Sequence, residues 1–492
     1  MPVCKVLYLG NTIDYMKQLL SILFSVSSFT LSAQTIDKYF ESIRKNEAEL
    51  TAFFQQMPKG GDLHNHFSGS IYAETYINYV VDKDYVINEN TLEVRTAAPD
   101  GDEWAHFSKL DKEGTLPAYK QKLIQKWSVK DYNGISYPSD KQFFETFGAF
   151  NIANKGAGRL DTGLLELKRR ALTENVTYIE TMFTSIPCGS LNKIDTSYNH
   201  LLETAQTKRD EALAIKQLDK LYKLIEDNNA GSCATVFNEE LTATHHRLKI
   251  DDSVFTMRYQ NYVVRVVPPV DVFKSLVVAF ESANSCPLIV GVNIVAPEDN
   301  EISMRDYWLH MEMFKYCHKK YPKVKYAMHA GELALGMVKP EDLTWHINAA
   351  VHIAGANRIG HGVDMAYEHK SYELLRYMAK NNIAIEINLY SNEFILKVKN
   401  DAHPLSLYRK FHVPITINTD DAGVLRSNLT HQYVLLAERY KDVSYEEIKQ
   451  YVYNSVDYSF IKEESIKDKL KAQLDARFSR FEREVINAYS AH

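Results

Sequence analysis

The chain has 492 residues, of which 45% are hydrophobic and 24% are charged, and its formal net charge is −6. This composition is typical of a soluble globular protein, and a chain of this length can bury a large core without disulfide or metal staples. The sequence contains neither a basic stripe nor a block of Lys and Arg, so a nucleic-acid partner is not expected.

An apolar segment near the N-terminus predicts export. Lys17 precedes the apolar run 19–31, and Ala33 follows it, an order typical of a secretory signal peptide. We therefore predict a leader over residues 1–33 and a mature protein over residues 34–492 that is periplasmic or secreted. An N-terminal core helix is the alternative interpretation, and Met16 is an alternative start. The run is too short to span a bilayer and no cysteine follows it, so no membrane anchor is expected.

The four cysteines that follow the predicted leader do not indicate a metal site or a dense disulfide framework. They are widely spaced and form no CxxC pair, so a thiolate zinc site is not indicated: Cys188, Cys233, Cys286 and Cys317. One or two disulfides are compatible with an oxidising compartment, but their pairing cannot be read from the sequence.

From residue 57 onward, short β-like runs alternate with longer helical patterns, which is typical of a parallel sheet built from βα units. The predicted strands are Gly60–His66, Thr177–Thr184, Val254–Val264, Leu288–Val295, Lys325–His329, Arg358–His361, Ile383–Leu389 and Pro414–Thr419. Eight strands predict a TIM (β/α)8 barrel. The third strand is the least secure, because Ser232–Phe237 competes for its place.

Amphipathic stretches between the strands predict the outer helices: Leu164–Glu174, Thr204–Asn228 and Tyr367–Asn381. Residues 82–140 are polar and rich in turn signals, so they predict an insertion or cap between the first and second barrel units. The charged tail from Tyr451 to His492 is expected to be helical and to pack outside the barrel.

Imidazoles and carboxylates gather where the predicted strands end. His64 and His66 occupy alternate positions on the first strand, so both side chains point to the same side. His329 and Glu332 end the fifth strand, and His361, between two glycines, ends the sixth. A single HxH pair is weak evidence in a chain with 17 histidines, but barrel enzymes build their active sites at this end of the strands.

The eighth strand ends in the adjacent carboxylates Asp420 and Asp421. Two carboxylates after a buried run are costly unless they are paired or bind a cation, although a helix N-cap is an alternative for Asp421. Three imidazoles and one carboxylate suit one Zn²⁺. The same donor set does not exclude Fe²⁺ or Mn²⁺. Such a metal lowers the pKa of a bound water to about 7, and Glu332 or His361 would then transfer protons.

These motifs resemble the adenosine deaminase family, and most closely its secreted, growth-factor-related branch. The resemblance runs in order through most of residues 57–430, in the segments MPKGGDLHNHFSGS, FFETFGAF, VGVNIVAPED, MHAGE, RIGHGVDM, IEINLYSNEF and ITINTDDAGV. It implies a zinc-dependent deaminase that converts adenosine and 2′-deoxyadenosine to inosine and ammonia. The implied partner is a small purine nucleoside, and a homodimer is a possible assembly.

The resemblance also implies a role for each residue of the site. The implied zinc ligands are His64, His66, His329 and Asp420. Glu332 would donate a proton to the purine ring nitrogen, and His361 would orient the attacking hydroxide. Asp421 would hold that hydroxide in line and would hydrogen-bond to the purine.

Three positions depart from the family pattern. Ser68 stands where many adenosine deaminases carry an acidic residue that contacts the ribose, and Ala296 stands where a glycine usually approaches the purine. Ala422 replaces the usual proline. None of these residues is implied in metal binding or proton transfer, so the departures concern the specificity for the sugar.

Adenine, a modified adenosine and a 5′-substituted nucleoside therefore remain alternative substrates, and a non-catalytic nucleoside-binding protein is a further alternative. A binuclear hydrolase is disfavoured because the fourth strand offers no bridging lysine. His245 and His246 are expected in a polar loop. Phe143–Phe150 is expected to wall the purine pocket, and Glu180 either orients a ligand or pairs with Arg or Lys.

Overall fold

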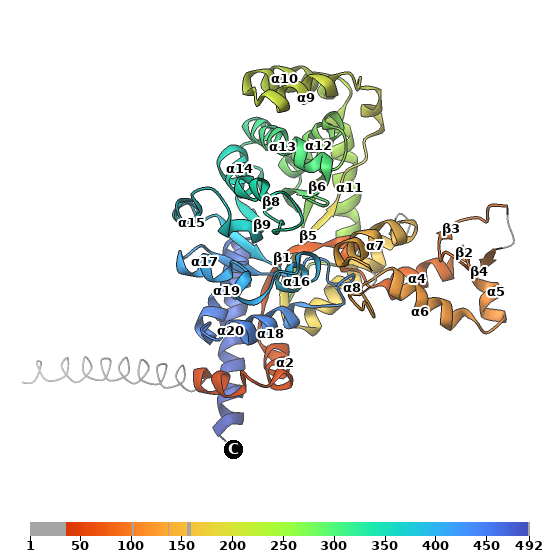
Figure 1. Cartoon of the computed structure of the whole chain (residues 1–492). Coiled ribbons are helices and arrows are strands. Elements are labelled where there is room, and N and C mark those ends of the chain that lie inside the picture. The colour runs from red at the N-terminus through yellow and green to blue at the C-terminus, as the bar shows by residue number, and fades with distance from the viewer. Residues whose placement is uncertain (1–35, 101–102, 136, 155–158, 491–492) are drawn as a thin grey trace, which may run out of the picture.

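Eight parallel strands surround the centre of the protein (Figure 1). The computed structural model describes residues 36–490 except 101–102, 136 and 155–158, and the predicted leader over residues 1–33 lies outside the described residues. In their order in the sheet, the strands are β1 (Gly60–His66), β5 (Val176–Thr184), β6 (Thr256–Val264), β7 (Ile289–Val295), β8 (Lys325–Ala330), β9 (Arg358–His361), β10 (Ala384–Ile387) and β11 (Ile415–Ile417). A parallel bridge between Asn65 and Asp420 brings the last strand beside the first. The predicted eight-stranded α/β barrel is therefore confirmed.

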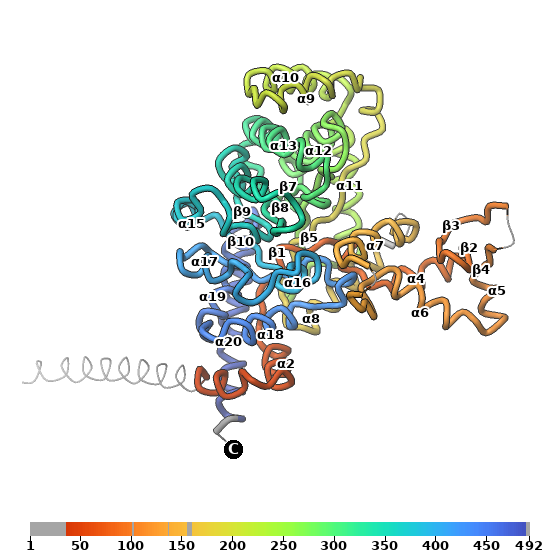
Figure 2. Tube along the Cα trace, in the orientation of Figure 1, coloured from red at the N-terminus to blue at the C-terminus, as the bar shows by residue number. Residues whose placement is uncertain are grey.

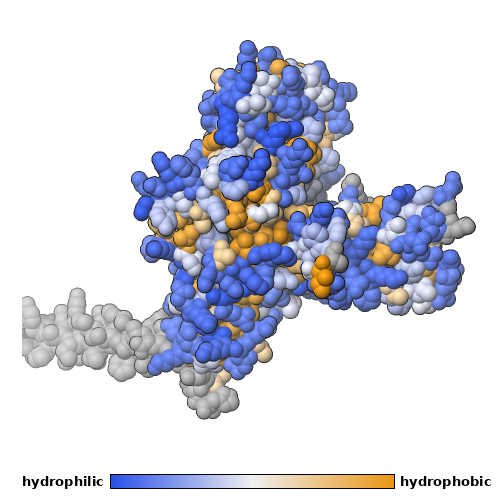
Figure 3. Space-filling view, in the orientation of Figure 1, coloured by the Kyte–Doolittle hydropathy of each residue, from blue (hydrophilic) through white to orange (hydrophobic). Residues whose placement is uncertain are grey.

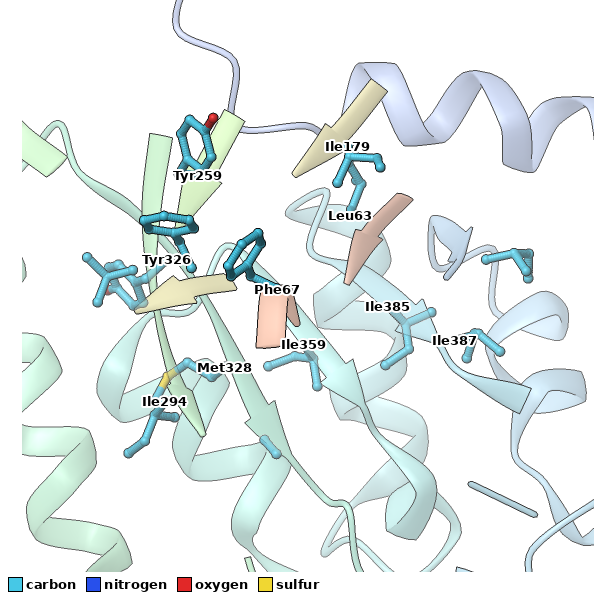
Figure 4. Close-up of a cluster of buried hydrophobic side chains, with 14 of the residues drawn as sticks. Leu63, Phe67, Ile179, Tyr259, Ile294, Tyr326, Met328, Ile359, Ile385 and Ile387 are labelled. Carbon is cyan, nitrogen blue, oxygen red and sulfur yellow. The ribbon is translucent and has the colours of Figure 1, made fainter. Parts of the chain in front are cut away.

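The barrel strands alternate between aliphatic and polar side chains. Leu63, Ile179, Met328 and Ile385 are buried in the hydrophobic cluster drawn in Figure 4. One residue further along the same strands stand His64, Glu180, His329 and Glu386, which are also buried. Because successive side chains of a strand point to opposite faces, one set packs toward the helices and the other fills the barrel interior.

Helices cover the outside of the barrel, as the chain trace in Figure 2 shows. They are α8 (Arg159–Thr173), α11 (Ala230–Arg247), α12 (Pro269–Ser285), α13 (Glu301–Lys320), α14 (His346–Ala349) with η3 (Ala350–Ala354), α15 (Ser371–Lys380), α17 (Leu405–Lys410) and α19 (Tyr445–Asp457). The predicted helical tail forms α19 and the long α20 (Glu464–Ser490).

Further segments extend from this barrel (Figure 1). The region predicted as an insertion over residues 82–140 contains β2 (Val86–Asn88), β3 (Val94–Arg95), β4 (Trp104–His106), α5 (Phe107–Lys112) and α6 (Leu116–Lys126). It lies between α4 (Ala73–Asp82) and α7 (Ser139–Asn154), and its three strands form a sheet of their own. The remaining elements are α2 (Glu47–Gln56), α3 (Phe67–Ser70), η1 (Gly189–Lys193), α9 (Tyr198–Lys208), α10 (Glu211–Asp227), η2 (Pro340–Thr344), η4 (Val363–Ala366), α16 (Leu389–Leu396), η5 (Asn400–Ala402) and α18 (Leu429–Arg439).

Two local predictions are wrong. The single helix predicted over 204–228 is two helices, because Arg209 adopts a left-handed conformation and Asp210 caps the second one by accepting from the N–H of Leu213. His245 and His246 lie on α11 and not in a loop, and His245 is buried. The competing strand Ser232–Phe237 belongs to the same helix, whose buried residues recur at helical spacing.

A disulfide between Cys188 and Cys233 joins the loop before η1 to α11, while Cys286 and Cys317 are free and buried. The face of the molecule shown in Figure 3 is mainly hydrophilic, with apolar residues gathered between the helices near its centre. Within the described part of the chain, no helix is long and apolar enough to cross a bilayer.

Buried His310 on α13 predicts sensitivity to acid. Neither of its ring nitrogens has a hydrogen-bond partner among the described residues. Burial, reinforced by Arg265 and Arg305, lowers its pKa to about 3. A depressed folded-state pKa gives stability that is present above the unfolded value of about 6.5 and is lost as the pH falls toward 3.

We therefore expect His310→Leu to lose less thermal stability than the wild type between pH 7 and pH 5. The melting temperature of both proteins, measured by circular dichroism at several pH values, checks this. His200→Leu, a change at an exposed histidine, is the control and should follow the wild type. Equal acid sensitivity in His310→Leu and the wild type would contradict the assignment.

Candidate active site

Four side chains converge at the carboxyl end of the barrel. The ligand atoms of His64, His66, His329 and Asp420 all lie within 4.8 Å of one another. The Nε2 atoms of His66 and His329 are 3.1 Å apart, and Oδ1 of Asp420 lies 3.2 Å from Nε2 of His66. Residues from β1, from β8 and from the loop after β11 thus meet at one point, as the sequence predicted from their places at strand ends.

The hydrogen bonds behind two of these imidazoles decide which nitrogen faces that point. Nδ1–H of His64 donates to Oε2 of Glu386 at 2.7 Å, and Nδ1–H of His329 donates to Oδ1 of Asn293 at 3.0 Å. The Nε2 atoms of both rings therefore face that point, and Nε2 of His64 is a buried nitrogen without a hydrogen-bond partner among the described residues. Three imidazole nitrogens and one carboxylate oxygen form a donor set that suits Zn²⁺.

Burial would lower the pKa of His64, but its contacts with Asp420 and Glu386 raise that pKa to about 10, so a cation would compete with a proton at this imidazole. Burial lowers the pKa of His329 well below its usual value, so this imidazole is neutral, the form that binds metal. Burial alone would raise the pKa of Asp420, but its contacts with His64 and His66 hold that pKa well below its usual value. The site thus combines a neutral imidazole with an ionised carboxylate.

A series of buried hydrogen bonds runs around the inside of the barrel from His64 to His329. We call this series the hydrogen-bond ring. Behind His64, Glu386 accepts from Nε of Arg358 at 2.5 Å, and a second nitrogen of Arg358 donates to Glu180 at 2.6 Å. Since β5 and β9 are not neighbours in the sheet, the bond between Arg358 and Glu180 crosses the interior. Glu180 thus pairs with an arginine and at the same time supports a candidate ligand through it.

The ring continues on the other side of the barrel. The amide of Gln260 donates to Glu180 at 2.8 Å, and the amide of Asn293 donates to Gln260 at 3.2 Å. Asn293 accepts from His329, which is the last residue of the series. The two imidazoles are therefore oriented by one continuous set of hydrogen bonds, as expected for the partners that hold metal ligands in place.

Glu332, His361 and Asp421 lie beside the four candidate ligands. Nδ1 of His361 is 3.6 Å from Oε1 of Glu332, and Nε2 of His361 is 4.0 Å from Oδ2 of Asp420. Burial, together with the negative charge of Asp420, raises the pKa values of Glu332 and Asp421 well above the usual range. Burial also lowers the pKa of His361 to about 3. Burial thus favours the protonated form of Glu332 and the neutral form of the His361 imidazole beside it.

The sequence did not single out Glu298, which holds the backbone at Glu332. Both of its oxygens are used, because Oε1 accepts from the N–H of Gly331 at 3.0 Å and Oε2 accepts from the N–H of Glu332 at 2.9 Å. Nδ1 of His346 donates to Oε1 at 2.6 Å. Burial would raise the pKa of Glu298, but the bond from His346 and the charge of Arg265 keep it lowered. The only signal in the sequence is a carboxylate soon after a fully apolar strand.

An open cavity of about 390 Å³ lies over these residues. Its apolar wall includes Phe143, Phe144 and Phe147 of α7, which is the wall predicted for the segment Phe143–Phe150. Ser68 and Ala296, predicted as substrate-binding positions, also line it. Ala296, His361 and Asp420 all have positive φ angles, of 84°, 66° and 62°. Strained backbone of this kind persists where a site requires it.

Comparison with known proteins connects this cavity to a family. Residues 277–477 match the adenosine deaminase family model. The matched segment contains Glu298, His329, Glu332, His361, Glu386, Asp420 and Asp421. His64, His66 and Ser68 lie outside it, and the fold brings them to the same cavity.

Individual relatives and solved structures are also similar to this chain. The adenosine deaminase of Clostridium acetobutylicum is 33% identical over 157 residues, which are 32% of this chain and 43% of that protein. The chain spans about half the length of the curated relatives it matches. An adenine deaminase structure from Arthrobacter aurescens has a TM-score of 0.55 at 14% identity and covers 86% of this chain and 99% of its own.

A zinc-bound amidohydrolase structure from Burkholderia ambifaria has a TM-score of 0.53 at 15% identity and covers 88% of this chain and 94% of its own. At these identities the two structures show that the barrel fold is shared. The matched sequence segment is what connects this chain to deaminases.

Glu386 provides a test of the ring. In Glu386→Gln, an amide N–H replaces one acceptor oxygen, so it faces the N–H of either His64 or Arg358. We expect the affinity for zinc to fall by about 10- to 100-fold. Competition with a chromophoric chelator, together with the metal content measured by mass spectrometry, checks this.

Glu373→Gln, which changes an exposed glutamate on α15, is the matched control. The wild type and the control should bind one zinc per chain with the same affinity. Unchanged affinity in Glu386→Gln would show that the ring does not act on the metal site.

Proposed function

We propose that the protein is a zinc-dependent hydrolase that deaminates adenosine and 2′-deoxyadenosine to the corresponding inosine nucleosides and ammonia. The observation that carries the proposal is the arrangement around Glu332. Its carboxyl group, whose protonated form is favoured by burial, lines a cavity with an aromatic wall, beside three imidazoles and a carboxylate that suit zinc. This arrangement lies largely within the segment matched to adenosine deaminases.

Each side chain has a chemical task in this proposal. When bound, a zinc ion supplies Lewis acidity, which lowers the pKa of a water in the site to about 7. Glu332 holds the proton that the purine ring nitrogen needs when water adds to the neighbouring carbon. His361 orients the attacking oxygen, and Asp421 hydrogen-bonds to the purine. The phenyl rings of Phe143, Phe144 and Phe147 offer an apolar surface to the planar base.

The alternative substrate is adenine or a modified or 5′-substituted adenosine. Ser68 and Ala296 support this alternative, because both line the cavity and neither offers a carboxylate to a ribose. The adenine deaminase from Arthrobacter aurescens, which shares the barrel, is named for the free base adenine. Adenosine remains the first choice because the curated relatives of the matched segment are adenosine deaminases.

We also propose that the protein is exported, as in the secreted, growth-factor-related branch of the family, and that residues 1–33 are removed. The disulfide between Cys188 and Cys233 supports this, because structural disulfides persist in oxidising compartments. Export would place the enzyme among extracellular or periplasmic nucleosides.

Intact mass spectrometry of the native protein without reductant tests export. We expect the mass of a chain that begins near residue 34 and lacks two hydrogens at the disulfide. A native chain that retains residues 1–33, or reduced thiols at both Cys188 and Cys233, would contradict the proposed location.

Glu332→Gln tests the function. An amide of nearly the same shape cannot donate the carboxyl proton, so we expect turnover of adenosine to fall by at least about 10²-fold while zinc content is unchanged. The loss of adenosine absorbance and the release of ammonia measure turnover. Glu341→Gln, which changes an exposed glutamate on η2, is the control and should match the wild type.

The outcomes separate the hypotheses. No turnover of adenosine by zinc-loaded wild type would exclude it as the substrate, and the same assay would then be run with adenine and 5′-substituted nucleosides. Full activity in Glu332→Gln would show that Glu332 is not the acid. Failure with every substrate, with nucleoside binding retained, would support the binding-protein alternative.

A further inference from the structure

The task proposed for His361 depends on which of its ring nitrogens carries the proton. A neutral imidazole has one N–H donor and one acceptor nitrogen, and its neighbours decide which is which. Nδ2 of Asn392, on α16, lies 2.9 Å from Nδ1 of His361, and both residues are buried. The orientation of this amide therefore decides the proton's position.

A backbone donor fixes the far end of this contact. The N–H of Leu405 donates to Nδ1 of His403 at 3.2 Å. A backbone N–H cannot accept, so Nδ1 of His403 must be the acceptor and carry no proton. Burial, reinforced by the charge of Arg439, lowers the pKa of His403 to about 3, which agrees with a neutral ring. The single proton of His403 is therefore on Nε2.

That proton orients the amide of Asn392. Nε2 of His403 lies 3.1 Å from Oδ1 of Asn392, which accepts from it. The other end of the amide, Nδ2, then has to face His361 as a donor. Nδ2 of Asn388 lies 3.4 Å from Nδ1 and 3.5 Å from Nε2 of His361, so it favours neither nitrogen, and the closer Asn392 decides between them. Nδ1 of His361 must accept, so it cannot carry a proton.

We propose that Asn392 and His403 are positioning residues that hold His361 as the Nε2–H tautomer. Nε2 is the nitrogen of His361 that lies toward Asp420 and the metal ligands, and Nδ1 lies on the side of Glu332. His361 therefore presents a hydrogen-bond donor to the place where the attacking oxygen must sit. The functional part of this inference rests on the proposed deamination, while the position of the proton does not.

Asn392→Asp reverses the polarity of the contact with almost no change of shape. A carboxylate accepts from His403 but cannot donate to His361, so it draws a proton onto Nδ1 of His361. Ring ¹⁵N–¹H spectra of the zinc-loaded protein with labelled histidine report which nitrogen carries the proton. Loss of signals in His361→Gln assigns the resonances of His361.

We expect His361 to be protonated at Nε2 in the wild type and at Nδ1 in Asn392→Asp. The value of kcat for adenosine should fall by about 10²-fold in Asn392→Asp, with KM and zinc content close to those of the wild type. Asn381→Asp, which changes an exposed asparagine after α15, is the matched control and should leave both readouts unchanged.

His403 gives a second test that keeps the site intact. His403→Gln retains an N–H that can donate to Asn392 and should keep kcat near the wild-type value. His403→Leu removes that donor, so the side-chain amide of Asn392 can flip, and kcat should fall by about 10-fold. A merely structural role would affect both variants through stability and not through the tautomer of His361.

The spectra keep this inference separate from the proposed function, because they require no turnover. Protonation of His361 at Nδ1 in the wild type, or an unchanged spectrum in Asn392→Asp, would overturn it. If the protein shows the expected tautomers but deaminates no substrate, the roles of Asn392 and His403 stand and the proposed activity is rejected.

Discussion

The burial of two carboxylates and one guanidinium inside the barrel is the constraint on which the site depends. Glu180, Glu386 and Arg358 are each 1% exposed or less. Ionised groups at such depth are tolerated only when they are paired and their remaining hydrogen-bonding capacity is used. Glu180 accepts from Arg358, Gln260, Tyr178 and the N–H of Phe460, and Glu386 accepts from Arg358 and His64.

Satisfying these charges also orients the candidate metal ligands. The N–H groups that complete the ring come from His64 and, through Asn293, from His329, so their Nε2 atoms are left to face the cavity. Burial would raise the pKa values of Glu386 and Asp420, but their hydrogen bonds and charged neighbours keep both pKa values lowered. Burial and the negative charge of Asp420 raise the pKa values of Glu332 and Asp421, which favours their protonated forms. The interior therefore favours a bound cation before any substrate arrives.

Much of this structure could be predicted from the sequence, because buried parallel strands read as continuous Val and Ile runs. The predicted strand Ile383–Leu389 encloses β10, and the residues at the strand ends meet as expected from barrel topology. Helix boundaries inside 204–247 were wrong because local polarity hides a turn at Arg209 and a helical face that includes His245. These features depend on long-range packing, which one sequence does not display.

The residues that sequence reasoning missed hydrogen-bond to the residues of the site and do not themselves line the cavity. Glu386 stands alone in an apolar run, and an inward-facing charge in a buried strand is a usable signal that a partner exists. Glu298 and Asn392 give no comparable signal, since acids and amides are common after strands. Their roles depend on which backbone N–H or imidazole lies within hydrogen-bonding distance, and only the fold supplies that information.

The most direct test of this account is an anomalous-difference map at the zinc absorption edge, from crystals of the protein grown with one equivalent of zinc. We expect a single strong peak per chain, bounded by Nε2 of His64, His66 and His329 and by the carboxylate of Asp420. A peak elsewhere, or none at this point, would contradict the claim that the barrel's buried charges are arranged to hold a metal.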